Sequence, residues 1–204
     1  MKLYFWLLPA LLLLQGCSAS VQVPEDRFYQ LRATAPIATY PAPVFSGGVI
    51  IDRVNADPMR SGRAILYSDA KKPLELKRYH YEFWIDQPPE LVQRALLAHF
   101  RDSRLADRVI DDTERADADY RLAVRLQRFE QLWDSARQGA DVDVELEVRL
   151  LANASRTTIW SQRYRQRRQV AGADMHATAA AMEAALGTIL EQLANDLALL
   201  GENR

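Results

Sequence analysis

The clearest pattern in the sequence is an alternation of apolar and polar residues in its second half. Three runs alternate in this way, at residues 122–127, 141–150 and 160–167. A period of two is typical of strands with one packed face and one hydrated face. Gln138-Gly139 and Asn153-Ala154-Ser155 separate the runs as turn signals. The pattern therefore predicts a long three-stranded antiparallel meander.

The polar positions of these runs differ in charge. The middle run is acidic, whereas arginines occupy polar positions of the first and third runs. The acidic residues are Asp141, Asp143, Glu145 and Glu147. In a meander the acidic strand lies between the two Arg-rich strands, where each opposite-charge cross-strand pair contributes about 0.2–1 kcal/mol. We therefore expect a charged, solvated sheet face.

Two segments have helical periodicity. In the first, apolar residues recur at helical spacing to about Arg101, after a start in which Asp86 or Gln87 can cap the helix and two prolines suit its first turn. In the second, apolar residues recur every three or four positions as far as about Leu200, with Asp174 as the expected N-cap. The apolar stripe of this second helix must pack on the sheet.

The first half of the chain reads as short strands. We expect them at residues 27–31, 49–54, 63–68 and 74–85, with an irregular, proline-containing connection at 32–46. The order of strands, helix, strands and helix predicts an α+β fold. In it, two helices cover one face of a mostly antiparallel sheet, and residues 27–204 form a single domain.

Composition and charge narrow the function classes. The 204 residues include 26 Lys+Arg and 27 Asp+Glu, so a formal net charge of −1 argues against nucleic-acid binding through bulk charge. The single cysteine excludes an intramolecular disulfide and a multi-cysteine metal site. A hydrophobic share of 49% is that of an ordinary globular protein.

That single cysteine is the residue with the most specific context. Residues 1–16 combine Lys2 with an apolar run at 3–14, which is the layout of a signal peptide and too short for a membrane span. Leu14-Gln15-Gly16-Cys17 is similar to a bacterial lipobox. We therefore expect cleavage before Cys17, covalent diacylglycerol and N-acyl lipid on Cys17 and a tether at 17–26; an ordinary signal peptide is the alternative. Ser18, rather than aspartate, favours the outer membrane.

The remaining chemistry-bearing residues do not form a recognised motif. His80, His99 and His176 lack metal-ligand spacing, so we interpret them as surface or packing residues. Asp111-Asp112 with Glu114 is compatible with acid–base chemistry or a cation site, but a solvated loop explains it better. The arginine-rich segment 163–168 is compatible with binding of acidic groups, although the neighbouring acidic strand can neutralise it. We expect no catalytic residue and no metal site.

Aromatic residues are dense at 79–84, where the sequence reads YHYEFW. A single buried face does not need all of these rings, so some are candidates for contact with a partner. We name Tyr79, Tyr81 and Trp84 as partner-binding candidates. A core role for most of them is the alternative interpretation.

Taken in order, four segments resemble the ABC-type transport auxiliary lipoproteins of Gram-negative bacteria. They are residues 28–31 (FYQL), 49–54 (VIIDRV), 61–67 (SGRAILY) and 76–91, the last an aromatic strand that runs through Trp84 into Pro88-Pro89 and a helix. The resemblance covers nearly the whole mature chain. It rests on order and spacing, because none of these segments is a catalytic signature.

The resemblance implies a function that the residues alone do not. It implies a non-enzymatic lipoprotein at the periplasmic face of the outer membrane, docking a periplasmic "mammalian cell entry" (MCE) protein that works with an ABC permease and ATPase. Such systems move lipids between membranes or maintain membrane integrity, and the lipoprotein could form a homo-oligomeric ring. Two alternatives stay open: a lipid carrier with an apolar cavity between sheet and helices, and a membrane-tethered hydrolase using Asp111 and Asp112.

Overall fold

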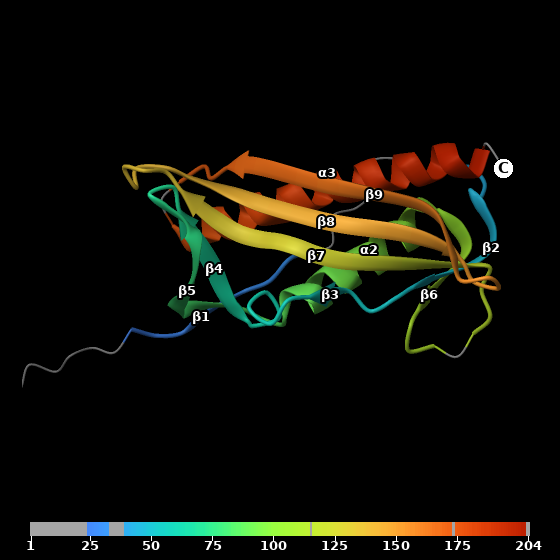
Figure 1. The fold of residues 1–204 in the computed structure, drawn as a ribbon, viewed down its shortest axis with the longest axis horizontal. Coiled ribbons are helices and arrows are strands. Elements are labelled where there is room, and N and C mark those ends of the chain that lie inside the picture. Colours follow the sequence, from blue (N-terminus) through green and yellow to red (C-terminus); the bar gives the residue numbers. More distant parts are fainter. Residues whose placement is uncertain (1–23, 33–38, 115, 173, 203–204) are drawn as a thin grey trace, which may run out of the picture.

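The computed structural model describes residues 24–32, 39–114, 116–172 and 174–202. Its centre is β7 (Tyr120–Trp133), which forms the predicted meander with β8 (Ala140–Ala152) and β9 (Thr157–Gln169) (Figure 1). β7 pairs antiparallel with β8, and β8 pairs antiparallel with β9 over its whole length. The meander predicted from the alternation is confirmed.

The other edge of β7 is shared by three short strands that follow one another along it. β2 (Phe45–Ile51), β3 (Asn55–Ala56) and β4 (Ala64–Asp69) pair with successive parts of β7, and all three run parallel to it. The chain thus advances along β7 in one direction, instead of turning back at each loop. Turn signals between neighbouring strands favour antiparallel hairpins, so they do not predict this parallel arrangement.

Three further pairings complete the nine-stranded sheet. β5 (Lys72–Trp84) pairs antiparallel with β4, β1 (Arg27–Tyr29) pairs parallel with β5, and β6 (Ala106–Asp111) pairs parallel with β2. Parallel pairs outnumber antiparallel ones by five to three. The prediction of a mostly antiparallel sheet is therefore wrong, and the sheet is mixed. The α+β class itself is confirmed.

Both helices pack on the same face of the sheet, and they contact each other (Figure 1). α2 (Pro88–Ser103) has Gln87 as its N-cap residue, but the Gln87 side chain makes no capping bond; Asp86 pairs with Arg94 at 2.7 Å instead. α3 (Met175–Glu202) is capped as predicted, since Asp174 Oδ1 accepts a hydrogen bond from the Ala177 N–H at 2.7 Å.

The core lies between the sheet and the two helices. Seven apolar residues of α3 that recur at helical spacing are at most 2% exposed, and the inward valines and leucines of β8 are fully buried. The α3 residues are Met182, Ala185, Leu186, Ile189, Leu190, Leu193 and Leu197. Burying one of the larger side chains contributes about 1.5–3 kcal/mol, so this stripe holds the helix on the sheet. Buried side chains of the sheet and of both helices form one continuous cluster in the layer in which the lipid-carrier alternative expected a cavity.

Candidate functional site

Cys17, the predicted lipid attachment site, lies outside the described residues, as does all of the predicted signal peptide 1–16. The first described residue is Pro24, which lies within the predicted tether. No helix among the described residues is long and apolar enough to cross a membrane. Lipidation of Cys17 therefore stays a prediction.

The structure separates the three aromatic candidates for partner contact. Trp84 is 1% exposed, and its ring packs 5.2 Å from that of Phe129, so it belongs to the core and cannot meet a partner directly. Tyr81 is 39% exposed and is the one of the three whose ring is open to solvent. Strand alternation explains why Tyr81 and Trp84 lie on opposite sides of β5. Tyr79 does not follow the same alternation, because the pairing of β5 with β4 shifts register between Arg78 and Phe83.

Tyr79 is half-buried in a chain of hydrogen bonds under α3. Its hydroxyl donates to Gln131 Oε1 at 2.6 Å and accepts from Trp133 Nε1 at 2.8 Å. Gln131 Nε2 in turn donates to Thr178 Oγ1 at 2.9 Å. Burial raises the pKa of the Tyr79 hydroxyl. These bonds join β5, β7 and α3, so the Tyr79 hydroxyl helps to hold α3 on the sheet.

The charge pattern of the meander forms a ladder of ion pairs on the face opposite the helices. Asp143 binds Arg165 and Arg167, and Glu145 Oε2 accepts from Arg128 Nε at 3.2 Å. Burial raises the pKa of Asp143, but the hydrogen bonds and charges of Arg165 and Arg167 outweigh it and hold that pKa below its usual value. The predicted acidic strand between basic strands is confirmed, although its central carboxylates are buried rather than solvated.

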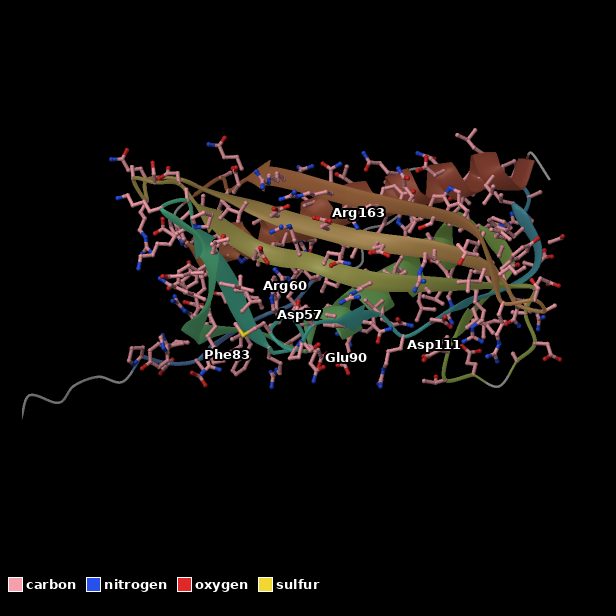
Figure 2. All side chains as sticks on the ribbon, viewed as in Figure 1. Asp57, Arg60, Phe83, Glu90, Asp111 and Arg163 are labelled. Atoms are coloured by element: carbon pink, nitrogen blue, oxygen red, sulfur yellow. The ribbon has the colours of Figure 1, made fainter. Side chains whose placement is uncertain are left out.

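The ladder continues beyond the meander to the loop between β3 and β4. Arg128 Nη1 also lies 3.2 Å from Glu130 Oε1, and the other Glu130 oxygen accepts from Arg60. Arg60 Nη1 then donates to Asp57 Oδ2 at 2.7 Å. Figure 2 shows Asp57 and Arg60 together, with Arg163 farther across the sheet. Distant parts of the chain are thus joined by one surface network, which the cross-strand pattern predicted only in part.

Asp111 and Asp112 line a polar groove of about 580 Å³ at the start of α2. Glu90 and Asp111, which Figure 2 labels, line this groove together with Arg53 and Arg94. Hydrogen bonds from Thr113 hold the pKa of Asp111 below its usual value, whereas burial and the neighbouring Asp111 raise the pKa of Asp112. Asp111 closes a local turn, accepting from the Thr113 hydroxyl at 2.7 Å.

The three histidines lie apart on different elements. His80 is exposed on β5 and His176 is exposed at the start of α3. His99 is buried on α2, with Nε2 3.9 Å from Glu191 Oε1. In the described ranges no group of three His, Cys, Asp or Glu side chains is placed to hold a metal ion.

One surface feature was not predicted. Phe28, expected to be part of a first strand, is 56% exposed and stacks on Phe83, and Ile85 is 46% exposed. The alternation of the aromatic segment could have indicated that either Trp84 or Phe83 faces outward. It could not indicate which, because that depends on the side on which α2 and α3 pack.

Comparison with known proteins decides the family. The model of the family described as ABC-type transport auxiliary lipoprotein component matches residues 29–194. The chain belongs to this family. The match begins at the last residue of β1 and ends within α3, so it includes β2 to β9, α2 and most of α3 of the auxiliary lipoprotein. Membership connects the protein with an ABC transport system of the cell envelope.

Solved structures show the same fold. Protein XCC0632 from Xanthomonas campestris is 23% identical, with a TM-score of 0.76 over 87% of this chain and 98% of that chain. An uncharacterized protein that is 10% identical has a TM-score of 0.63 over 85% of this chain and 99% of that one. No curated protein matches the auxiliary lipoprotein.

Proposed function

We propose that this protein is a lipid-anchored, non-enzymatic subunit of an ABC transport system, docking a periplasmic MCE protein at the outer membrane. The observation that carries the proposal is the family match over residues 29–194, directly behind a lipobox-like segment that ends at Cys17. The system would move lipids between the membranes and so maintain envelope integrity. A homo-oligomeric ring is part of the same proposal.

The anchor is supported by the chemistry of the leader. A single acyl chain binds a membrane only marginally, whereas two or three chains hold a protein stably at about 0.8 kcal/mol for each buried CH₂. Diacylglycerol and an N-acyl chain on Cys17 would meet that requirement. Ser18 supports sorting to the outer membrane.

A docking role is supported by the rigid charged surface of the meander. The arginines of the ladder are partly exposed, since 65% of the Arg163 side chain and 56% of the Arg167 side chain are accessible. Exposed charges of this kind increase the rate and specificity of protein association more than its affinity. The ion pairs hold them in defined positions.

Purification of the native lipoprotein from detergent-solubilised membranes tests the proposal. We expect an MCE-domain protein and the ABC permease and ATPase to copurify, after mild cross-linking in cells. A matched purification of the Cys17→Ser variant should lose these partners, because the variant stays in the inner membrane. Recovery of the lipidated protein without any of the three partners would contradict the proposed function.

A further inference from the structure

An apolar surface is exposed where the chain enters the fold. Phe28 and the partly exposed Phe83 are paired across β1 and β5, and their rings stack with centroids 5.8 Å apart. Tyr81 and Ile85, two positions before and after Phe83, are also exposed, whereas the intervening Glu82 and Trp84 are buried. Tyr81 and Ile85 therefore lie on the same side as Phe83. We call Phe28, Tyr81, Phe83 and Ile85 the β1–β5 apolar surface. Figure 2 shows Phe83 at the edge of the molecule, at the end where Figure 1 labels β1 and β5.

The opposite side of the same two strands is packed in the interior. Trp84 contacts Phe129 there, and the Tyr29 hydroxyl donates to the buried Glu82 carboxylate at 2.8 Å. The strands are therefore well packed on their inner side, and their outer side carries the exposed apolar residues. A contiguous exposed apolar patch is typical of a protein or membrane interaction site, whereas single exposed apolar residues are not.

Arg63 lies at the rim of this surface in a defined orientation. Its Cζ is 5.3 Å from the centroid of the Phe28 ring, and its Nε donates to the Trp84 carbonyl oxygen at 3.1 Å. The remaining N–H groups of the guanidinium can donate to a phosphate. Aromatic rings beside an arginine are typical of the membrane–water interface, where the rings meet the apolar side and the guanidinium stays hydrated.

The position of the surface relative to Cys17 points to the occupant. Seven peptide units separate Cys17 from Pro24, which at about 3.3–3.6 Å each span at most about 25 Å. β1 follows within three residues of Pro24. Figure 1 shows the β8–β9 turn at the opposite end of the long axis. A lipid on Cys17 would therefore keep the β1–β5 apolar surface close to the bilayer.

We propose that the β1–β5 apolar surface rests on the headgroup region of the membrane that holds Cys17, with Arg63 meeting lipid phosphates. This inference depends on the lipid anchor of the proposed function. The contact orients the domain, so that the β8–β9 end points away from the membrane. Glu25 and Asp26 lie just before β1, so apolar burial, rather than attraction to anionic lipid, provides the contact.

Fluorescence quenching in vesicles tests this orientation. The lipidated full-length protein is reconstituted in phosphatidylethanolamine–phosphatidylglycerol vesicles that contain nitroxide-labelled lipid. An environment-sensitive fluorophore is attached to the thiol of a Phe28→Cys variant. Only this thiol reacts, because the sulfur of Cys17 is already bound to lipid. Ser155→Cys, in the exposed β8–β9 turn, is the matched control. Ile85→Cys provides a second position that leaves the Phe28–Phe83 stack intact.

We expect severalfold stronger quenching at positions 28 and 85 than at 155, and weaker quenching at 85 when Arg63→Gln is added. Equal quenching at 85 and 155 would overturn the proposal. A second result would also overturn it: labels at 28 and 85 that are not quenched, together with a disulfide between two unlabelled Phe28→Cys copies. A second copy of the protein, rather than the membrane, would then cover the surface. A mass spectrum without lipid on Cys17 would instead overturn the anchor, and the orientation with it.

Discussion

Arg165 on β9 binds the carboxylate of Asp143 on β8 through two nitrogens, although the Asp143 side chain has no exposed surface. Arg165 Nε donates to Oδ1 at 2.8 Å and Nη2 donates to Oδ2, which also accepts from Arg167 Nε at 3.2 Å. A buried carboxylate is costly unless it is paired and hydrogen-bonded. The two arginines satisfy this condition, and their outer parts stay in contact with water.

Removing this carboxylate should destabilise the fold. We expect Asp143→Ala to lower the free energy of unfolding by about 2–3 kcal/mol, because it leaves two arginines without their charged acceptor. Urea unfolding followed by circular dichroism measures the change. The control is Asp141→Ala, on the same side of β8, for which we expect a change within about 0.5 kcal/mol. Equal losses in the two variants would contradict the interpretation.

The same carboxylate should make stability depend on acidic pH. Its pKa is lower in the folded protein than in the unfolded chain. Its contribution is therefore complete above the unfolded pKa of about 3.9 and is lost as the pH falls through the folded value. The difference in unfolding free energy between the wild type and Asp143→Asn should be constant near neutral pH and shrink below about pH 4. A difference that is unchanged down to about pH 2 would disprove this origin.

The hydrogen bond between Tyr164 and Asp196 should help to hold α3 on β9. The Tyr164 hydroxyl donates to Asp196 Oδ2 at 2.5 Å, and burial together with this bond raises the pKa of Tyr164. Tyr164→Phe should lower the free energy of unfolding by about 1–2 kcal/mol, since the bond has a charged acceptor. Thermal unfolding measures this loss of stability, and Tyr67→Phe, which removes a tyrosine hydroxyl elsewhere in the sheet, is the control. A loss no larger than the control's would assign the stability to ring packing alone.

The anchor prediction is tested by Cys17→Ser. Without the thiol, diacylglycerol cannot be attached, so we expect an uncleaved precursor that remains with the inner membrane. Mass spectrometry and separation of the two membranes measure this outcome. Ser18→Ala is a matched control that should be processed normally. Correct cleavage and outer-membrane sorting of Cys17→Ser would show that the lipobox interpretation is wrong.

The hydrolase alternative makes a contrasting prediction at Asp112. If this carboxyl, whose pKa is raised, donated a proton in catalysis, Asp112→Asn would abolish activity in cells. We expect instead that the variant restores membrane integrity to a deletion strain as well as the wild type does. Growth in the presence of detergent measures this. Failure of Asp112→Asn to restore growth, at normal protein levels, would favour an enzyme.

Several features followed from local sequence. The alternation at 122–150 and the turn residues between its runs predicted the meander, because side-chain period and turn chemistry act over a few residues. Asp174 was predicted as a cap for the same reason. The opposite charges of β8 and its neighbours predicted ion pairs, since strands of a meander are paired by necessity.

The tertiary structure decided the remaining features. The parallel pairing of β2, β3 and β4 with β7 depends on contacts between residues about 70 positions apart, on which turn signals carry no information. The position of the helices decided that Trp84 is buried, whereas Phe28 is exposed and Phe83 partly so. The burial of Asp143 likewise depends on arginines that cover it from the next strand. Sequence period thus determined which residues share a face, whereas long-range packing determined which face meets water.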